Sequence, residues 1–130
     1  MRMWNVDPRI MCRQHLLGEH VETHMLVGSI SKRISLFGYA TSNLLEVGKL
    51  RYRHDLLAKE MLRRGFAHNS PLPDFDTSYL GEIEATMTID VAKAKAGLLA
   101  RCNSCSEQAE MLAARGMLSE LGCEPPNCIL

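Results

Sequence analysis

The residues best suited to chemistry lie in one short segment near the start of the chain, Arg13 to Met25. His15, Glu19 and Glu22 are spaced i, i+4 and i+7, so a helix would place all three on one stripe of its surface. Gly18 lies beside that stripe, where a missing side chain leaves room for a ligand. An imidazole and two carboxylates on one helix face predict acid–base chemistry.

A second reactive group is the α-amino group of Met1. The reference pKa of such an amine is near 7.7–8.0, so a useful fraction is neutral and nucleophilic at physiological pH. Arg2 is too large for the usual trimming of the initiator methionine, and we therefore expect the amine to belong to Met1 itself. The alternative is an ordinary frayed terminus with no chemical role.

Three blocks of the sequence, taken together and in order, resemble one enzyme family. The blocks are Gln14-His15-Leu16 with Glu19 and Glu22; Leu50-Arg51 to Arg64-Gly65-Phe66; and Glu84-Ala85-Thr86 through Ile89 with Ala92, Lys93 and Arg101. They span about residues 1–101. In this order they are similar to the pyrimidine-dimer DNA glycosylases, the phage endonuclease V-like family.

This resemblance implies a reaction and the residues that carry it. In these enzymes the N-terminal amine attacks the sugar C1′ of the damaged nucleotide and forms a Schiff base, which leads to N-glycosidic cleavage and β-elimination at the abasic site. Met1 matches the nucleophile and Glu22 the essential glutamate, and no cofactor is required for catalysis. The partner is double-stranded DNA containing a damaged or modified base. The residues expected to bind it are Arg2, Gln14, His15 and Lys93.

The chain departs from the family pattern at several positions. Val21 and Met25 stand where the phage enzyme has arginines on its first helix, and Gly97 replaces a lysine. The aromatic C-terminal segment of that enzyme has no counterpart here. Fewer positive charges predict weaker contacts with phosphates. The resemblance therefore supports glycosylase and lyase activity on damaged or modified pyrimidines, and leaves open whether pyrimidine dimers are the substrate.

Two histidines in the same segment could bind a metal instead. His20 and His24 are spaced i and i+4, so both can reach one ion from a single helix face, which would lie opposite the Glu22 stripe. His54 or His68 could supply a further ligand. The alternative is that these are partly buried histidines with hydrogen-bond partners.

Four cysteines near the C-terminus form a second candidate metal group. Cys102-x2-Cys105 precedes an expected helix and Cys123-x4-Cys128 follows it, so four thiolates could form a structural zinc site that pins this helix. Reduced thiols are the alternative, and disulfides fit least well with a cytoplasmic protein.

The remaining pattern predicts an all-α fold, a compact single domain of three main helices plus a C-terminal helix. Residues 1–101 form the glycosylase-like helical domain, and 102–130 a cysteine-containing helical extension packed on the same domain. Helices are expected at about 8–30, 43–64, 86–100 and 106–121, with a break at Gly38-Tyr39-Ala40 and a loop over 68–79. Arg51-Tyr52-Arg53-His54 is equally consistent with phosphate contacts and with solvated arginines beside a core tyrosine.

Charge and composition set the remaining limits. The formal net charge is zero, but residues 1–70 hold 11 Lys and Arg against 6 Asp and Glu, whereas residues 71–130 hold 4 against 9. A basic first half could steer a polyanion. No apolar run is long enough to span a bilayer, and we expect a cytoplasmic monomer with no membrane contact. The competing hypotheses are a non-catalytic DNA-binding module of the same fold and a metal-binding helical bundle.

Overall fold

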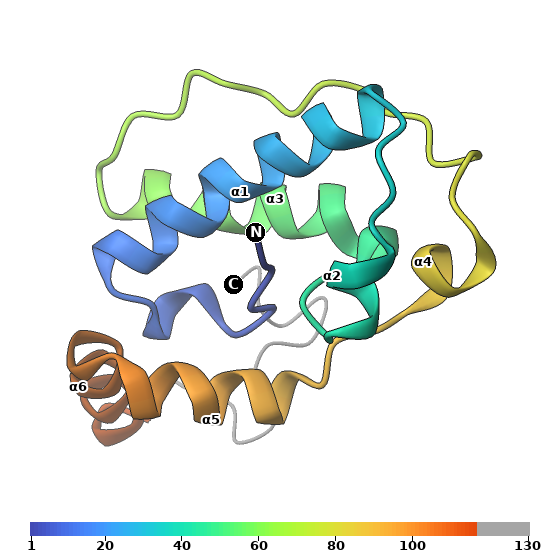
Figure 1. Ribbon diagram of the computed structural model, residues 1–130. Coiled ribbons are helices and arrows are strands. Elements are labelled where there is room, and N and C mark those ends of the chain that lie inside the picture. The colour runs from blue at the N-terminus through green and yellow to red at the C-terminus, as the bar shows by residue number, and fades with distance from the viewer. Residues whose placement is uncertain (117–130) are drawn as a thin grey trace.

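Two helices that pack against each other, α1 (Arg13–Ser31) and α3 (Leu50–Arg63), form the centre of the molecule (Figure 1). The computed structural model describes residues 1–116, and this part of the chain contains helices and no strands. The other elements are η1 (Pro8–Ile10), α2 (Phe37–Thr41), η2 (Val47–Lys49), α4 (Glu82–Thr86), α5 (Val91–Arg101) and α6 (Asn103–Ala114). The predicted all-α class is confirmed, with short helices added to the main ones.

The first helix begins later than the sequence suggested. Asp7 and Pro8 do start a helical turn, because the Asp7 carboxylate accepts the Arg9 backbone N–H at 2.9 Å, but this turn is the short 3-10 element η1. Met11 then adopts an extended conformation and is fully buried. Cys12 becomes the N-cap of α1, its sulfur accepting the His15 N–H at 3.5 Å. The predicted helix start at residue 8 was therefore wrong, because the chain forms a separate turn there and α1 begins only at Arg13.

The segment between the central helices also differs from expectation. Gly38-Tyr39-Ala40, predicted as a break, lies inside α2, where Ala40 is buried. Asn43 follows with φ +61°, and its side-chain oxygen accepts the Asp90 backbone N–H at 3.3 Å. Helix α3 begins only at Leu50. It ends as predicted, with Gly65 in the left-handed region at φ +85°.

The helix expected over residues 86–100 begins later, at Val91, and a separate short helix precedes it. Helix α4 ends at Thr86, and α5 begins at Val91 with Asp90 as its N-cap, which accepts the Lys93 N–H at 3.0 Å. Cys102 ends α5 and caps α6, so only one residue separates these two helices. The far end of the predicted C-terminal helix, with Cys123 and Cys128, lies outside the described residues.

The N-terminal segment is part of the core. Met3, Trp4 and Val6 are buried, and the Met3 N–H donates to the Leu44 carbonyl at 2.7 Å. Helix α6 packs against η1 and α5, as seen at the lower left of Figure 1. None of the helices in residues 1–116 is both long and apolar enough to cross a membrane.

Candidate active site and metal-ligand clusters

A cavity of about 320 Å³ lies between the N-terminal segment and one face of α1. Its lining brings together most of the residues singled out from the sequence: Arg2, Trp4, Gln14, His15, Gly18, Glu19 and Glu22. The α1 residues recur at helical spacing, so one face of the helix forms a wall of the cavity. A Cβ added to Gly18 would meet nothing within 4 Å, which means that this wall is open at its centre.

The two carboxylates of this face have different surroundings. Glu19 is 1% exposed and forms a two-point ion pair with Arg53 of α3, with Arg53 Nε to Glu19 Oε2 at 2.5 Å and the second contact at 2.9 Å. Arg53 also donates to the Val6 carbonyl, which ties in the N-terminal segment. Glu22 is half-buried and has no hydrogen-bond or ion-pair partner within residues 1–116. The Glu19 carboxylate is therefore engaged in a structural ion pair, whereas the Glu22 carboxylate is free to act on a ligand.

Arg2 supplies positive charge at the cavity. Its guanidinium carbon lies 3.5 Å from the centre of the Trp4 ring, a cation–π contact that orients the side chain. Burial lowers the pKa of Arg2, and Arg101 at the end of α5 lowers it further, whereas the carboxylates of Glu19 and Glu22 raise it. Arg2 thus lies within electrostatic reach of Glu22 and of a second cation, Arg101.

The chain terminus is held close to the cavity. Met1 is half-buried and packs against the core, and its neighbour Arg2 lines the cavity. The start of the chain therefore lies next to a residue that lines the cavity. The buried Met3 anchors this segment.

Lys93, the remaining predicted DNA contact, is not part of this cavity. It lies exposed in the first turn of α5. Val21 and Met25 are 55% and 52% exposed, and they continue the row of Gln14 and Gly18 along α1. These two positions, which depart from the expected family pattern, are thus apolar and exposed to solvent.

A cluster of sulfur and nitrogen atoms lies beside the cavity. Cys102 and Cys105 meet Cys12 and His15, and one candidate ligand atom from each lies within 4.8 Å of the others. Burial raises the pKa of the Cys105 thiol to about 12, whereas the Cys105 backbone N–H lowers the pKa of Cys102. The sequence reasoning missed Cys12, although Cys12-x2-His15 repeats the spacing of Cys102-x2-Cys105.

Four histidines gather on the opposite face of α1. His20 and His24 meet His54 of α3 and His68 of the following segment, with ring centres 4.9 to 5.3 Å apart. The Nε2 atom of each ring is buried and has no hydrogen-bond partner among the described residues. Burial lowers the pKa of His20 to about 4, and the neighbouring histidines add to this effect. The interpretation of these residues as core histidines with hydrogen-bonded rings is therefore contradicted at the Nε2 atoms, which have no partner among the described residues.

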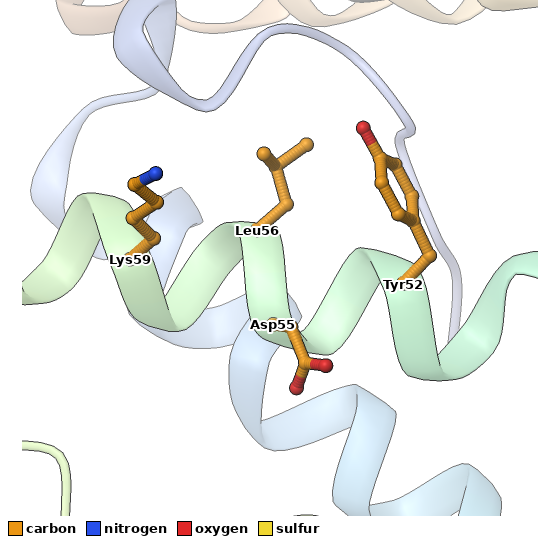
Figure 2. A pocket seen from close by; sticks show the side chains of 4 residues that line it. All are labelled: Tyr52, Asp55, Leu56 and Lys59. Atoms are coloured by element: carbon orange, nitrogen blue, oxygen red, sulfur yellow. The ribbon is translucent and has the colours of Figure 1, made fainter. Parts of the chain in front are cut away.

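A second hollow, of about 230 Å³, is formed along α3. Tyr52, Leu56 and Lys59 point to one side of the helix, while Asp55 points away from them (Figure 2). All four of its described lining residues come from one helix. The first cavity combines two segments distant in sequence and holds a carboxylate and a guanidinium, so it is the stronger candidate for an active site.

Comparison with known proteins gives a family match over a region that contains the lining residues of both hollows. A family model described as pyrimidine dimer DNA glycosylase matches residues 1–74, which include every described residue that lines the first cavity. Neither the curated proteins nor the solved structures yield a match.

Proposed function

Because the chain belongs to the pyrimidine dimer DNA glycosylase family, we propose that this DNA glycosylase also cleaves abasic sites, through a Schiff base formed by the amine of Met1. The excised group is a damaged or modified pyrimidine in double-stranded DNA. The observation that supports this mechanism best is the position of Glu22, a carboxylate without a protein partner in residues 1–116 that lines a cavity close to the N-terminus.

The proposed reaction uses two groups of the chain. The neutral amine attacks C1′, and the C1′–N1 bond breaks as the pyrimidine leaves with the bonding electrons and takes up a proton. The sugar ring opens to a Schiff base, loss of a C2′ proton expels the 3′ phosphate, and water then hydrolyses the imine and restores the amine. Glu22 stabilises the developing positive charge and moves the protons. Flipping the nucleotide into the cavity costs a few kcal/mol.

Charge around the cavity supports a DNA substrate. Arg2 lies within electrostatic reach of Glu22 and of a second cation, Arg101, and its guanidinium can bind a phosphate of the substrate. Gln14 lines the same wall as Glu22 and carries an amide that can donate to a base or a phosphate. Val21 and Met25 supply no such contact, so we propose that phosphate binding is concentrated at the N-terminal end of α1.

Borohydride trapping tests the proposal directly. Untagged protein is incubated with DNA containing an abasic site or a thymine dimer, and borohydride is added to reduce any imine. We expect a covalent adduct on abasic DNA with the protein that starts at Met1. An N-terminal extension should abolish it, and the same extension placed at the C-terminus should not.

Two carboxylate variants complete the test. Glu22→Gln should lower strand cleavage by about 10²- to 10⁴-fold, the range expected for loss of a general acid–base group. Glu110→Gln, on the exposed side of α6, is the matched control and should cleave normally. If no condition gives an adduct, the lyase mechanism through a Schiff base is wrong. If abasic DNA reacts and the dimer does not, the mechanism stands and the excised base is a different one.

A further inference from the structure

We propose that Cys12, His15, Cys102 and Cys105 form a structural zinc site that fixes the start of α1 to the junction between α5 and α6. Two of the ligands lie within the matched family region and two lie beyond it, in a part of the chain that the family model does not cover. The site is distinct from the proposed catalytic pair, because neither Met1 nor Glu22 belongs to it.

The distances agree with tetrahedral zinc coordination. With Zn–S near 2.3 Å and Zn–N near 2.0–2.1 Å, two sulfurs on one ion are about 3.8 Å apart, and a sulfur and a nitrogen about 3.6 Å. Cys12 Sγ and Cys102 Sγ are 3.9 Å apart. His15 Nδ1 is 3.2 Å from Cys12 Sγ and 3.7 Å from Cys105 Sγ. A single ion at the centre of the four atoms accounts for all three contacts.

The surrounding backbone is arranged to stabilise thiolates. The Cys12 N–H donates to Cys105 Sγ at 3.2 Å, the Cys105 N–H to Cys102 Sγ at 3.4 Å, and the His15 N–H to Cys12 Sγ at 3.5 Å. Each sulfur therefore accepts a backbone hydrogen bond, which favours the charged form that a metal requires. Zinc binding would displace the thiol protons, and its binding energy would then add to the stability of the fold.

Four protein ligands leave no open position on the ion. Such closed sites are structural, whereas catalytic zinc keeps a position for water or substrate. Zinc coordination would occupy His15 Nδ1. His15 would then support the cavity wall and be less suited to bind DNA through that atom. Its ring also packs against Trp4, with centroids 6.0 Å apart, and thereby links the metal to the cavity that Glu22 lines.

The test uses the untagged full chain and two readouts. Purified without chelators, it should contain zinc. Replacement by Co²⁺ should give the strong near-ultraviolet sulfur-to-cobalt absorption of a thiolate site, which needs no variant to observe. Cys12→Ser and Cys105→Ser should lose this absorption and bind zinc more weakly. The double variant Cys123→Ser/Cys128→Ser should keep it, which separates this ligand set from one that uses the last two cysteines.

Three outcomes would overturn the proposal. The first is wild-type protein that holds no zinc and gives no thiolate absorption with Co²⁺. The second is metal-free protein two mass units lighter than its sequence, which would indicate a disulfide. The third is loss of the thiolate absorption in the Cys123→Ser/Cys128→Ser variant with retention in Cys12→Ser.

The four histidines on the other face of α1 support a second inference, which rests on different atoms. His20, His54 and His68 each offer a ligand atom within 4.8 Å of the others, and their buried Nε2 atoms are unpartnered within residues 1–116. A buried polar atom without a partner costs free energy that a bound ion would recover. We infer that these three histidines, with His24 beside them, bind one zinc-like divalent transition-metal ion.

The chemistry of the donors limits the choice of ion. Neutral imidazole suits Zn²⁺, Cu²⁺, Ni²⁺ and Fe²⁺ and not Ca²⁺ or Mg²⁺. His54 Nδ1 lies 2.9 Å from the Asp55 carboxylate, which can orient the ring in the way outer carboxylates do at metal sites. The ion would join α1, α3 and the segment that follows α3.

Metal stoichiometry separates this site from the cysteine site. We expect two equivalents of Zn²⁺ per wild-type chain, and a Co²⁺ titration whose second equivalent adds no thiolate absorption. His68→Gln, in a half-buried side chain outside the helices, should lower the stoichiometry to one and leave the thiolate absorption unchanged. A saturated wild-type chain that binds no metal, or only one equivalent with the full thiolate absorption, would overturn the inference, since ordered water alone would then satisfy the four rings.

Discussion

The two faces of α1 present polar side chains in opposite ways. On the side toward α3 the histidine rings are enclosed, and Glu19, at the edge of the cavity face, is paired with Arg53. On the face toward the cavity, Glu22 is half-buried without a partner in the described part of the chain, and Gly18 leaves open space. Both faces share one backbone and follow the same helical spacing. Helical spacing therefore determines the face on which a residue lies, whereas the presence or absence of a partner determines whether the residue stabilises the fold or is available for the reaction.

The largest effect expected from this comparison is on stability, at the buried Glu19–Arg53 ion pair. Glu19→Gln or Arg53→Met would leave one buried charge without its partner, which costs about 3–5 kcal/mol in the free energy of unfolding. Glu22→Gln, three residues away, should change it by less than about 0.5 kcal/mol. Urea unfolding followed by circular dichroism measures all three variants.

A double variant keeps this prediction testable if the single variants do not fold. Glu19→Leu/Arg53→Met removes both charges together, and it should recover a large part of the loss because no unpaired charge remains. Equal stability of Glu19→Gln and the wild type would contradict the structural assignment of Glu19. It would also weaken the distinction between the two carboxylates.

The cavity face was predictable because its contacts are local. His15, Glu19 and Glu22 share a side of α1 through the geometry of any α-helix, and the all-α class follows from the same periodicity. The helix boundaries were harder, since they depend on caps. Cys12 caps α1 with its sulfur, and Asn43 takes a left-handed conformation that delays the start of α3. The sequence pattern does not indicate either role.

The partners of the site residues were not predictable, because they come from distant parts of the chain. Arg53 lies 34 positions after Glu19, and the sequence suggested phosphate contacts or solvent for it, not a buried ion pair. Cys105 lies 93 positions after Cys12, so only the packing of α6 against η1 brings them together. Contacts at such separations follow from tertiary packing, which composition and periodicity do not specify.

The enclosed histidines should make the stability of the protein depend on pH once a chelator has removed any bound metal. Burial lowers the pKa of His20 to about 4 in the folded state, while an unfolded histidine titrates near 6.5. Between these values the unfolded chain binds a proton that the folded chain does not, so stability should fall as the pH drops from about 6.5 toward 4.

Urea unfolding at several pH values measures this slope. His20→Gln cannot take up the proton and should flatten the curve in this range. Stability that rises on acidification between pH 6.5 and 4 would show that these rings gain protons on folding, which contradicts an enclosed neutral cluster.

Basic residues introduced on the cavity side of α1 should strengthen DNA binding. Val21→Arg and Met25→Arg replace exposed apolar side chains, so the fold should tolerate both. Each new phosphate contact should steepen the slope of log affinity against log salt by about one unit and tighten DNA binding at low salt. Leu62→Arg, at a residue of α3 that is 58% exposed, is the matched control. An equal gain from Leu62→Arg would mean that added charge acts through the whole protein and not through this face.

The smallest effect is expected at Gly18. An added Cβ meets nothing within 4 Å at Gly18 or at Gly28 of the same helix, so alanine at either position should raise the free energy of unfolding by about 0.4–1 kcal/mol. Only Gly18 lines the cavity, and a methyl group there intrudes on the space that a flipped nucleotide would use. Gly18→Ala should therefore weaken binding of abasic DNA severalfold, while Gly28→Ala leaves it unchanged. Equal activity of the two variants would show that DNA does not approach α1 at this point, and that the open space beside Glu22 is not where the sugar binds.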